Sequence, residues 1–525
     1  MEHSVDFIWP ELHGPWRKLS KSFKLAFLSV CLIGSITHIY IFSNLILNHD
    51  SVWRLYYDNN NLPLGRWSLQ FFSEISTRFQ LPVVAAVISI LMLALSAALT
   101  VRFLDISNKV SIVLVSGFIA SFPPAACIFS YMFTADAYFI GLFFSVLAAF
   151  CLKKYRFGGI PFVILLAVSC GIYQPFICYA IGLLLADCII RLFSDEALKT
   201  IVRDGLRYIA LIIIALVGYY AVANLLLTLQ HKTFSDYQNV DSFSIWNLKE
   251  FLSQLPAAYQ KYLVYFFHSS YLTDFFQAIQ VCFLGLSLAA LIYLVFSEKI
   301  YKDSVRLLLL TAGVLLLPMA LDFITVLSAG AWVHELMLYS FVLQFALSIK
   351  AIESALKKLI VKNSNNWPIL YLANIFLAAL LIWNNFCVCN TAYLRLQVCY
   401  ENSFALANRI VSRIESLDGY APDIPVAIIG EASPAFYGNT VPQFSQFNSL
   451  TGTNDVLLFT PEPHIRTRRF IEHYIGIHMP KPGRELLDML DASEEVKSIP
   501  SYPAEGSVVM YNDIIIVKLS EGAAL

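Results

Sequence analysis

Long apolar stretches recur through this 525-residue chain. A helix of about 20 apolar residues crosses the roughly 30 Å hydrocarbon core of a bilayer. Segments 81–101, 208–228 and 276–297 are apolar on every face, whereas a helix on the core of a soluble protein keeps a polar stripe. Only 14% of the residues are charged, against about a quarter in soluble domains. The chain is therefore predicted to be a polytopic α-helical membrane protein.

About eleven transmembrane helices are expected. The N-terminal residues 1–23 contain prolines, tryptophans and carboxylates, which favours a cytoplasmic segment over a cleaved export signal. The transmembrane domain is expected over 24–392. The number of spans depends on whether the short segments 138–152, 160–173 and 336–350 each cross the membrane. The spans are placed at 24–46, 81–101, 110–132, 138–152, 160–173, 175–191, 208–228, 276–297, 307–327, 336–350 and 369–391.

The positive charges fix the expected orientation. If the N-terminus is cytoplasmic, the inner segments hold 20 lysines and arginines and the outer loops between spans hold six. Such an excess marks the cytoplasmic side of a membrane protein. The first loop and the 229–275 loop are then expected outside. The C-terminal region is expected outside as well if the number of spans is odd, whereas an even number would place it in the cytoplasm.

The composition changes in residues 393–525, where prolines and charges return. The apolar runs shorten to strand length in IPVAIIG (424–430), DVLLF (455–459), SVVMY (507–511) and DIIIVKL (513–519). Segments 396–417 and 465–479 have the pattern of helices, and Gly419 and Pro422 fit the end of the first one. A small α/β domain on the outer face is predicted.

Several functional classes lack their sequence signals. The chain has no phosphate-binding glycine loop, no zinc-ligand spacing and no Gly-x-Ser-x-Gly elbow. Most of the ten cysteines lie in or beside apolar spans, where a thiol behaves as a small hydrophobe. The basic run HIRTRRF (464–470) is interpreted as a solvated helix face, with contact to acidic glycan or lipid headgroups as the alternative; no nucleic acid partner is expected.

The first outer loop, NHDSVWRLYYDNNNLPLGRW (48–67), is the most polar segment at a membrane edge. If 48–58 continues as helix, Asp50, Arg54 and Asp58 fall on one face at i, i+4 and i+8. One interpretation is a carboxylate acting as general base, with arginines that hold a lipid phosphate. The other is an interfacial helix with an exposed ion-pair ladder and no catalytic role. The residues alone favour neither.

Further ionisable side chains lie near the outer ends of other spans. Asp136 sits in the short turn TADAY, and Asp322 follows Pro318 near the end of its span. Ionisable groups at this depth are costly and usually face a polar cavity or a partner. Together they suggest one outward-facing wet pocket, although each one alone fits a structural role. By contrast, Asp187 and Arg191 near an inner boundary are interpreted as a snorkelling pair.

At this point the chain resembles a known family. A first span followed by NHDS, a GRW within about twenty residues and a second span that starts with LP resemble the polytopic O-antigen-modifying glucosyltransferases of bacteria and their phages. The segments FPP (122–124), YMFTADAYFIGL and YQPF (173–176) fit the same pattern. The resemblance covers most of residues 30–230 and becomes weaker in the later spans.

The resemblance implies a GT-C-like membrane fold and a polyprenyl-phosphate-linked glucose donor on the periplasmic side of the bacterial inner membrane. The implied acceptor is an O-antigen or lipopolysaccharide glycan. An acidic residue in the first outer loop is the usual base of GT-C enzymes, which corresponds here to Asp50, with Asp58 and Asp136 as second candidates. Some members of the wider class use a divalent metal and others do not, so a divalent metal is left open.

The expected site follows from these residues and from the chemistry of transfer. A carboxylate would take the proton of the attacking sugar hydroxyl, and cationic side chains would stabilise the departing lipid phosphate. Candidates for the phosphate site are Arg54, Arg66, His231 and Lys232. Residues of the motifs and of the outer cluster are expected to line the pocket: His49, Trp67, Tyr138, Tyr173, Gln174, Asp322, His334 and Glu335.

Two other functions are compatible with a membrane protein of this composition. A transporter or flippase of a lipid-linked sugar would show inverted or parallel repeats and broken helices at the midplane, and no convincing repeat is present. An O-antigen polymerase-like enzyme differs only in its diphosphate-linked donor and stays open.

Overall fold

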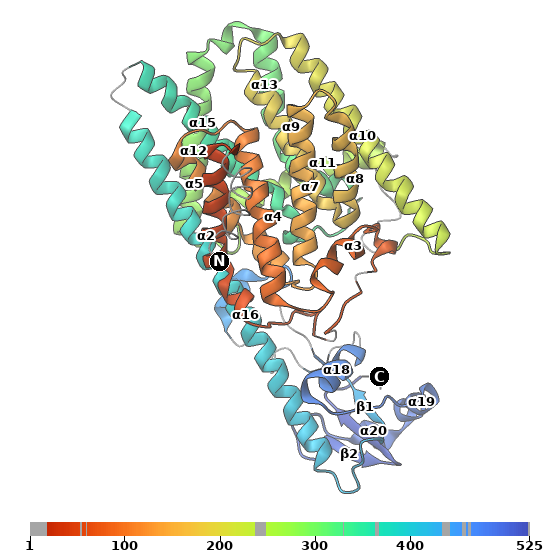
Figure 1. Cartoon of the computed structure of the whole chain (residues 1–525). Helices are drawn as coiled ribbons and strands as arrows, with labels where there is room; N and C mark the ends of the chain where they lie inside the picture. Colours follow the sequence, from red (N-terminus) through yellow and green to blue (C-terminus); the bar gives the residue numbers. More distant parts are fainter. Residues whose placement is uncertain are drawn as a thin grey trace, which may run out of the picture.

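The apolar segments form a bundle of long helices, and a small α/β domain lies beyond one end of it (Figure 1). The computed structural model describes residues 18–52, 55–58, 60–236, 248–328, 330–362, 367–432, 441–453, 458–459 and 464–522. We call the end of the bundle that faces the α/β domain the domain end, and the opposite end the far end.

Within the described residues, nine helices are long and apolar enough to cross a membrane. Their composition explains this, since each holds an 18-residue window with at most two charged residues. They are α2 (Lys21–Ser43), α4 (Pro82–Phe103), α7 (Ala135–Lys154), η3 with α9 (Gln174–Arg191), α10 (Leu198–Leu229), α12 (Asp274–Ser297), α13 (Ser304–Leu321), η7 with α15 (Glu335–Val361) and α16 (Trp367–Glu415).

Two further segments fill the remaining expected positions. Helices α5 (Lys109–Ser121) and α6 (Pro123–Phe129) meet at a 42° bend. The bend falls at Phe122, which is extended before two prolines, because a residue before proline disfavours the helical region. Helix α8 (Gly159–Ile172) has 14 residues and covers roughly 21 Å. Every expected span therefore coincides with helix, while the total of eleven stays a prediction.

The outer helices present apolar side chains to the surroundings of the bundle. In α10, Tyr208, Ala215 and Tyr219 are buried, whereas Leu206 and Leu225 are exposed. An apolar helix that is exposed along most of its length is unfavourable in water and stable in lipid. This pattern supports a polytopic membrane protein.

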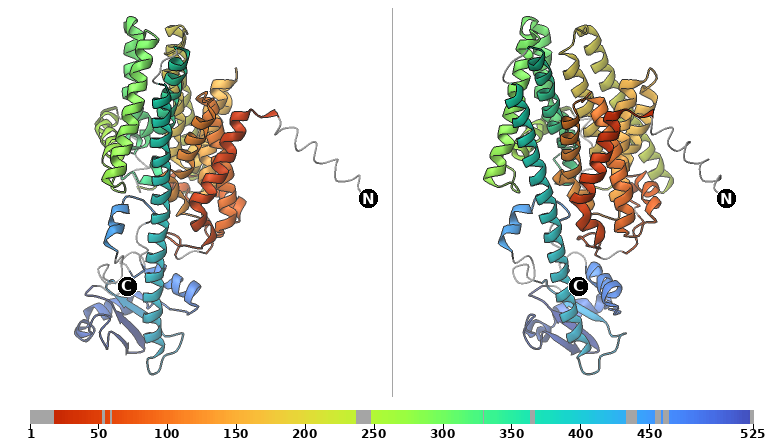
Figure 2. Two further views of the ribbon diagram at one scale, coloured as in Figure 1. Left: turned by 90° about the vertical axis from the view of Figure 1, so that its left-hand side faces the viewer. Right: turned by 60° about the vertical axis from the view of Figure 1, so that its left-hand side comes forward.

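Helix α16 joins the bundle to the α/β domain. Its 49 residues span roughly 70 Å, more than a bilayer requires, and all views show it running the length of the molecule (Figures 1 and 2). Tyr393 in α16 lies 2.6 Å from His38 Nδ1, and His38 Nε2 lies 2.9 Å from the Ala120 carbonyl. This buried contact ties α16 to α2 and α5.

The α/β domain contains a three-stranded sheet in the order β1-β3-β2. Strand β1 (Val426–Ile429) is parallel to β3 (Ile514–Lys518), and β2 (Val508–Tyr511) is antiparallel to it. One face of the sheet packs on α19 (Arg484–Ala492) and α20 (Glu494–Ser498), and α16 contacts β2 on the other side. Three of the four expected strands are thus confirmed; most of the fourth, DVLLF, lies outside the described residues.

The helix considered for 48–58 is absent from the described residues of that segment. Residues 48–52 form turns, and Tyr56 pairs with Phe79 in an antiparallel bridge. The Tyr57 amide donates to the Arg78 carbonyl at 2.9 Å. Asp50 and Asp58 therefore do not share a helix face, and Arg54 lies outside the described residues. The short helices α3 (Leu69–Ser73), η1 (Leu62–Leu64) and η2 (Glu74–Ser76) complete this loop.

Three further differences concern the later chain. The 229–275 loop contains an unexpected helix, α11 (Leu248–Phe267). The expected span at 369–391 and helix at 396–417 are one continuous α16, so the expected domain boundary at 393 lies inside a helix. The expected helix at 465–479 is α18 (His464–Phe470) with a π-helical turn (Ile471–Ile475), which ends at Gly476 in the left-handed region.

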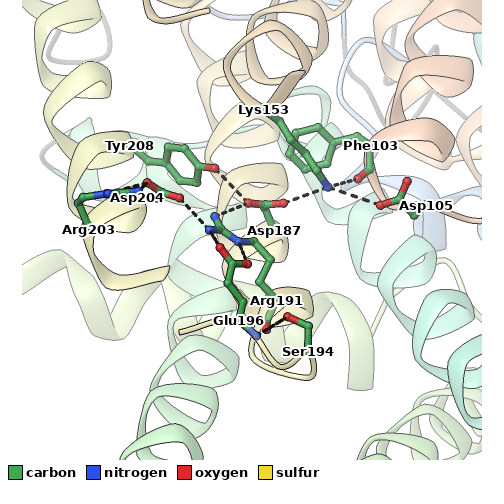
Figure 3. Close-up of polar contacts among 10 residues, drawn as sticks. All are labelled: Phe103, Asp105, Lys153, Asp187, Arg191, Ser194, Glu196, Arg203, Asp204 and Tyr208. Atoms are coloured by element: carbon green, nitrogen blue, oxygen red, sulfur yellow. Dashed lines mark hydrogen bonds and ion pairs between the residues drawn. The ribbon is translucent and has the colours of Figure 1, made fainter. Parts of the chain in front are cut away.

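Asp187 and Arg191 belong to a larger network than the expected pair (Figure 3). Asp187 is 2% exposed and accepts contacts from Lys153 at 2.9 Å, Arg191 at 3.3 Å and Tyr208 at 3.0 Å. Arg191 also pairs with Glu196 and Asp204. This network joins α7, α9 and α10 at the far end.

Candidate active site

The NHDS motif forms a rigid turn that presents Asp50. The Asn48 side-chain oxygen accepts hydrogen bonds from the amides of Asp50 and Ser51, both at 3.0 Å. The backbone amide of Asn48 donates to Ser51 Oγ at 2.8 Å, and Gln80 Nε2 donates to the Ser51 carbonyl at 3.0 Å. Asparagine favours such turns because its side chain imitates a backbone carbonyl. The buried turn thus holds a carboxylate that is 41% exposed.

Asp50 lies in a group of polar side chains that comes from three parts of the chain. His49 Nε2 is 3.6 Å from Asp50 Oδ2, and Arg466 Nη2 is 3.7 Å from Asp50 Oδ1. Arg466 Nη1 also donates to the His49 carbonyl at 3.3 Å. The Tyr131 ring meets the His49 ring edge-on at 5.9 Å. Arg466 belongs to α18, so the α/β domain contributes a cation to the group.

A second contact seats the α/β domain on the bundle. Gly452 has a φ of +81°, and a side chain there would overlap Ser130 and Tyr131. The Glu335 amide donates to Thr451 Oγ1 at 3.2 Å. Only glycine combines this backbone conformation with such a close approach. The contact holds the domain against the turn that carries Tyr131.

Tyr138 of the TADAY segment and Tyr173 of the YQPF motif form a stack of two rings, which Arg66 of the GRW motif contacts. The Tyr138 and Tyr173 rings are parallel at 4.4 Å, and the Arg66 guanidinium lies 4.9 Å from the Tyr173 ring centre. Arg66 Nη1 donates to Tyr138 Oη at 3.1 Å. Gln174 donates to the Leu64 carbonyl at 2.6 Å. A guanidinium held over a ring in this way is oriented for bidentate contact with phosphate or carboxylate.

A third group surrounds Lys261 of α11. Lys261 Nζ approaches Thr325 Oγ1 at 3.4 Å and the Val333 carbonyl at 3.3 Å, and Thr325 Oγ1 donates to Asp322 Oδ1 at 2.9 Å. Asp322 and Glu335 lie within electrostatic range of Lys261. Among the described residues, Asp322 Oδ2 and Glu335 Oε2 are buried without a hydrogen-bond partner. Two such oxygens can still accept hydrogen bonds from a ligand.

His334 and Tyr131 connect the three groups. His334 is within electrostatic range of His49, Lys261 and Arg66. Tyr131 is within range of Asp50, Tyr173 and Tyr138. These contacts place the groups around one region at the domain end of the bundle. We call it the domain-end cluster; its members are His49, Asp50, Arg66, Tyr131, Tyr138, Tyr173, Lys261, Asp322, His334, Glu335 and Arg466.

Burial and neighbouring charges set the protonation of the cluster. Burial lowers the pKa of His49; Asp50 opposes this shift and Arg466 adds to it. Burial, followed by the nearby His49, Lys261 and Arg66, lowers the pKa of His334. Both imidazoles therefore favour the neutral form. Burial also lowers the pKa of Lys261, against the effect of Asp322 and Glu335.

The other candidate acids have different surroundings. Asp136 is buried in the first turn of α7, where its Oδ1 accepts the Ala137 amide at 2.8 Å, and the Ser76 hydroxyl lies nearby. A carboxylate at this position also interacts favourably with the helix dipole. Asp58 is exposed, and its Oδ1 accepts the Asn60 amide at 3.3 Å. Asp136 Oδ2 is buried without a hydrogen-bond partner among the described residues, as are the second oxygens of Asp322 and Glu335. Both Asp136 and Asp58 are nevertheless held by amides of their own segment, which suits a structural role.

The remaining candidates lie at the edge of the site. His231 and Lys232 are exposed just beyond α10, and Lys232 donates to Gln230 at 3.2 Å. Trp67 packs against Gly171, where a side chain would collide with its ring. Among the described residues, no three His, Cys, Asp or Glu side chains gather as ligands for a metal ion.

The sequence did not single out Arg466, Tyr131 or Lys261. Arg466 lies in the run HIRTRRF, for which a solvated face was the favoured interpretation. Arg466 is 417 positions along the chain from His49, whose carbonyl it contacts, so its contacts with His49 and Asp50 could not be inferred from spacing. The alternative interpretation of this basic run was contact to acidic glycan or lipid headgroups, and it did not foresee a contact with Asp50 of the same chain.

Comparison with known proteins gives one match. The family model described as Glucosyl transferase GtrII matches residues 39–345, more than half of the chain. The matched region includes the NHDS turn. It also includes every residue of the domain-end cluster except Arg466. No curated protein and no solved structure matches.

Proposed function

The chain belongs to the GtrII glucosyl transferase family, and on this premise we propose that it moves glucose from a polyprenyl-phosphate-linked donor to an O-antigen or lipopolysaccharide glycan. Family membership makes the protein a membrane glucosyltransferase. The lipid phosphate donor, the glycan acceptor and the GT-C-like arrangement of the fold come from the motif resemblance and are part of the proposal.

The observation that carries the proposal is the position of Asp50. A buried turn presents its carboxylate, partly exposed, beside His49 and Arg466 at the domain end. In the proposed step, Asp50 accepts the proton of an acceptor hydroxyl while that oxygen bonds to the anomeric carbon of glucose. The bond from the anomeric carbon to the phosphate oxygen breaks, and the lipid phosphate departs with the electron pair. One displacement inverts the anomeric centre.

Cationic side chains of the domain-end cluster support the departure of the phosphate. Arg66 is held over Tyr173 and bonded to Tyr138, which leaves its guanidinium oriented. Arg466 adds a second cation beside Asp50. Fixed cations stabilise charge as it develops on a leaving group without the cost of reorganisation. We assign the phosphate contact to Arg66 and Arg466 ahead of the exposed His231 and Lys232.

The acceptor would bind near Asp322 and Glu335. Asp322 and Glu335 offer buried carboxylate oxygens without hydrogen-bond partners among the described residues, and sugar hydroxyls are suitable donors to such oxygens. The α/β domain lies at the same end of the bundle (Figure 2), where it can contact a long glycan. We propose that 24–392 catalyses transfer and that 393–525 is an extracytoplasmic domain at the periplasmic face of the inner membrane.

Direct transfer by purified protein tests the proposal. Full-length protein in nanodiscs is incubated with labelled polyprenyl-phosphate-glucose and lipid-linked O-antigen, and label in the glycan is measured. Transfer by wild type and its loss in Asp50→Asn would support the proposal. Label in the glycan only when the donor carries a diphosphate would favour the polymerase-like alternative, and movement of labelled lipid between leaflets without transfer would favour a flippase.

A further inference from the structure

A pocket of about 280 Å³ lies at the far end of the bundle, away from the domain-end cluster. It is bounded by the ends of α9, α12 and α15, where these helices leave the apolar part of the bundle. One wall is polar and the other is apolar. The residues that line it are Ile189, Ile190, Phe193, Leu294, Glu298, Lys350, Ala351, Ser354, Lys357 and Lys358.

Three lysines on α15 dominate the polar wall. Lys350 Nζ donates to the Asp105 carbonyl at 2.8 Å. Lys357 pairs with Glu353 at 2.7 Å, and Lys358 pairs with Glu298 at 2.6 Å. Since an ammonium group has three N–H donors, each lysine can make further hydrogen bonds.

The charges of this wall do not cancel. Glu298 is the acidic residue among the lining residues, against three lysines. Glu353 is 3% exposed and lies behind Lys357, where it also accepts the Ser107 amide and hydroxyl. The lining is therefore cationic, which favours an anion.

The opposite wall suits hydrocarbon. Ile189, Ile190, Phe193 and Leu294 supply apolar surface to the pocket. Along α12, the neighbouring Phe296 is 62% exposed on the outside of the bundle. An anion with an apolar part therefore fits the pocket better than a free inorganic ion.

We propose that this pocket binds the headgroup phosphate of an anionic glycerophospholipid, with the acyl chains lying along the exposed apolar side of α12. The lysine and arginine distribution of the sequence predicts that the far end is cytoplasmic, and basic pockets between transmembrane helices on that side bind anionic headgroups. The volume accommodates a phosphate with its glycerol. The bound lipid links α9, α12 and α15 and does not depend on the proposed transfer reaction.

Lipid titration of the full-length protein in detergent tests this inference. The probes are phosphatidylglycerol, phosphatidylcholine with the same chains, and inorganic phosphate, and the readouts are bound lipid by native mass spectrometry and the midpoint of thermal unfolding. Wild type is expected to retain phosphatidylglycerol and to unfold at a higher temperature with it. Phosphatidylcholine and phosphate at equal concentration are expected to have no such effect.

Two variants locate the lipid. Replacing Lys350, Lys357 and Lys358 with glutamine is expected to weaken phosphatidylglycerol binding at least about tenfold. The control replaces Lys154, Lys199 and Lys302, exposed lysines at the same end, and is expected to bind as wild type does. Two of the lysines also pair with Glu298 and Glu353, so their replacement could act through the lost ion pairs. A second variant, Ala351→Phe, therefore fills the pocket without a change of charge. It is expected to lose the lipid as well.

Four experimental outcomes would contradict a lipid site in this pocket. Equal binding of phosphatidylglycerol and phosphatidylcholine, or equal weakening in the pocket and control triples, would overturn the site. Stabilisation by inorganic phosphate alone, lost in the pocket triple, would show a free-anion site and overturn the lipid assignment. Unchanged phosphatidylglycerol binding in a folded Ala351→Phe protein would place the lipid elsewhere.

Discussion

Asp187 at the far end of the bundle and the two acids Asp322 and Glu335 at the domain end are paired in opposite ways. At the far end, both Asp187 oxygens are occupied by Lys153, Arg191 and Tyr208 (Figure 3). At the domain end, Asp322 Oδ2 and Glu335 Oε2 are buried without hydrogen-bond partners among the described residues. Asp187 is saturated by the fold, whereas Asp322 and Glu335 keep capacity for a ligand. Glu353, beside the far-end pocket, also keeps one buried oxygen without a partner among the described residues.

This difference separates stabilisation from function. A buried carboxylate with its cations in place contributes to a fixed helix arrangement, and removal of one partner is costly. A buried carboxylate with a free oxygen costs stability, and such a cost is typical of sites that bind or react. The comparison predicts that matched substitutions at the two ends affect different properties, activity at one and folding at the other.

The largest effect on activity is expected for Asp50→Asn. The amide keeps the shape of the side chain and its exposure, so the NHDS turn and the thermal unfolding midpoint should be unchanged. Loss of the base is expected to lower the rate of glucosyl transfer by about 10²- to 10⁴-fold. The measurement is labelled-glucose transfer in nanodiscs at saturating donor.

Asp274→Asn is the matched control for this substitution. Asp274 is an exposed acid in the first turn of α12, at the domain end of the bundle, and its variant should keep wild-type transfer. Asp58→Asn and Asp136→Asn should each retain more activity than Asp50→Asn, because both side chains have local roles. Full transfer by Asp50→Asn would remove Asp50 as the base and leave the family assignment intact.

At the far end, Asp187→Asn is expected to act on folding. The substitution leaves Lys153 and Arg191 near a neutral amide in a site where the carboxylate is 2% exposed. Loss of one partner of a buried charge group costs about 3–5 kcal/mol of unfolding free energy. The yield of folded protein and the unfolding midpoint in nanodiscs should fall, while the folded fraction transfers glucose at the wild-type rate. A stable variant with impaired transfer would break the distinction between the two ends.

The membrane helices could be predicted from sequence because one local property decides them. A run of about 20 apolar residues is stable across the bilayer only as helix, since its backbone groups must be satisfied internally. The positions of α4, α10 and α12 follow from this alone, and the strands β1, β2 and β3 follow from short apolar runs between turns. The bend at Phe122 corresponds to a local signal as well, the two consecutive prolines that follow this residue.

The first outer loop and α16 show where local patterns fail. The spacing of Asp50 and Asp58 fits a helix, but tertiary pairing of Tyr56 with Phe79 extends that segment. The boundary expected at 393 rested on composition, whereas α16 continues through it because Tyr393 and the buried Arg395 pack against the bundle and the domain. Arg466 reaches Asp50 only through the docking of the domain, which no sequence spacing encodes.

Arg466→Gln tests whether the α/β domain takes part in transfer. Charge-assisted contacts contribute about 1.5–3 kcal/mol, so removal of this cation should lower transfer by about ten- to a hundredfold. Arg466→Lys should recover part of the loss, because it restores the charge without the planar guanidinium. A reduction in kcat with little change in the unfolding midpoint would assign Arg466 to the site.

Arg484→Gln provides the control within the same domain. Arg484 is exposed at the start of α19, on the far side of the sheet from α16, and its loss should leave transfer unchanged. If both substitutions reduce transfer equally, the effect comes from a disturbed structure of the α/β domain or from the loss of positive charge anywhere on it. The proposed role of Arg466 would then be wrong, and the domain-end cluster would lie within the bundle alone.

The smallest expected effect is a pH dependence that comes from His49. Burial lowers its pKa below the ordinary value of 6.5, so the imidazole is neutral at pH 7 and takes up a proton only at lower pH. The folded protein binds this proton less readily than the unfolded chain, so the contribution of His49 to stability is complete above pH 6.5 and is lost as the pH falls through the lowered value. A protonated His49 pairs with the Asp50 carboxylate, 3.6 Å away, and competes with the acceptor hydroxyl for it. His49→Gln should therefore transfer better, relative to wild type, by about twofold at the acid end of the pH range in which both proteins stay folded than near pH 7.5. The exposed His473→Gln is the control. A constant ratio for His49→Gln across that range, measured where both proteins stay folded, would show that His49 does not tune the base.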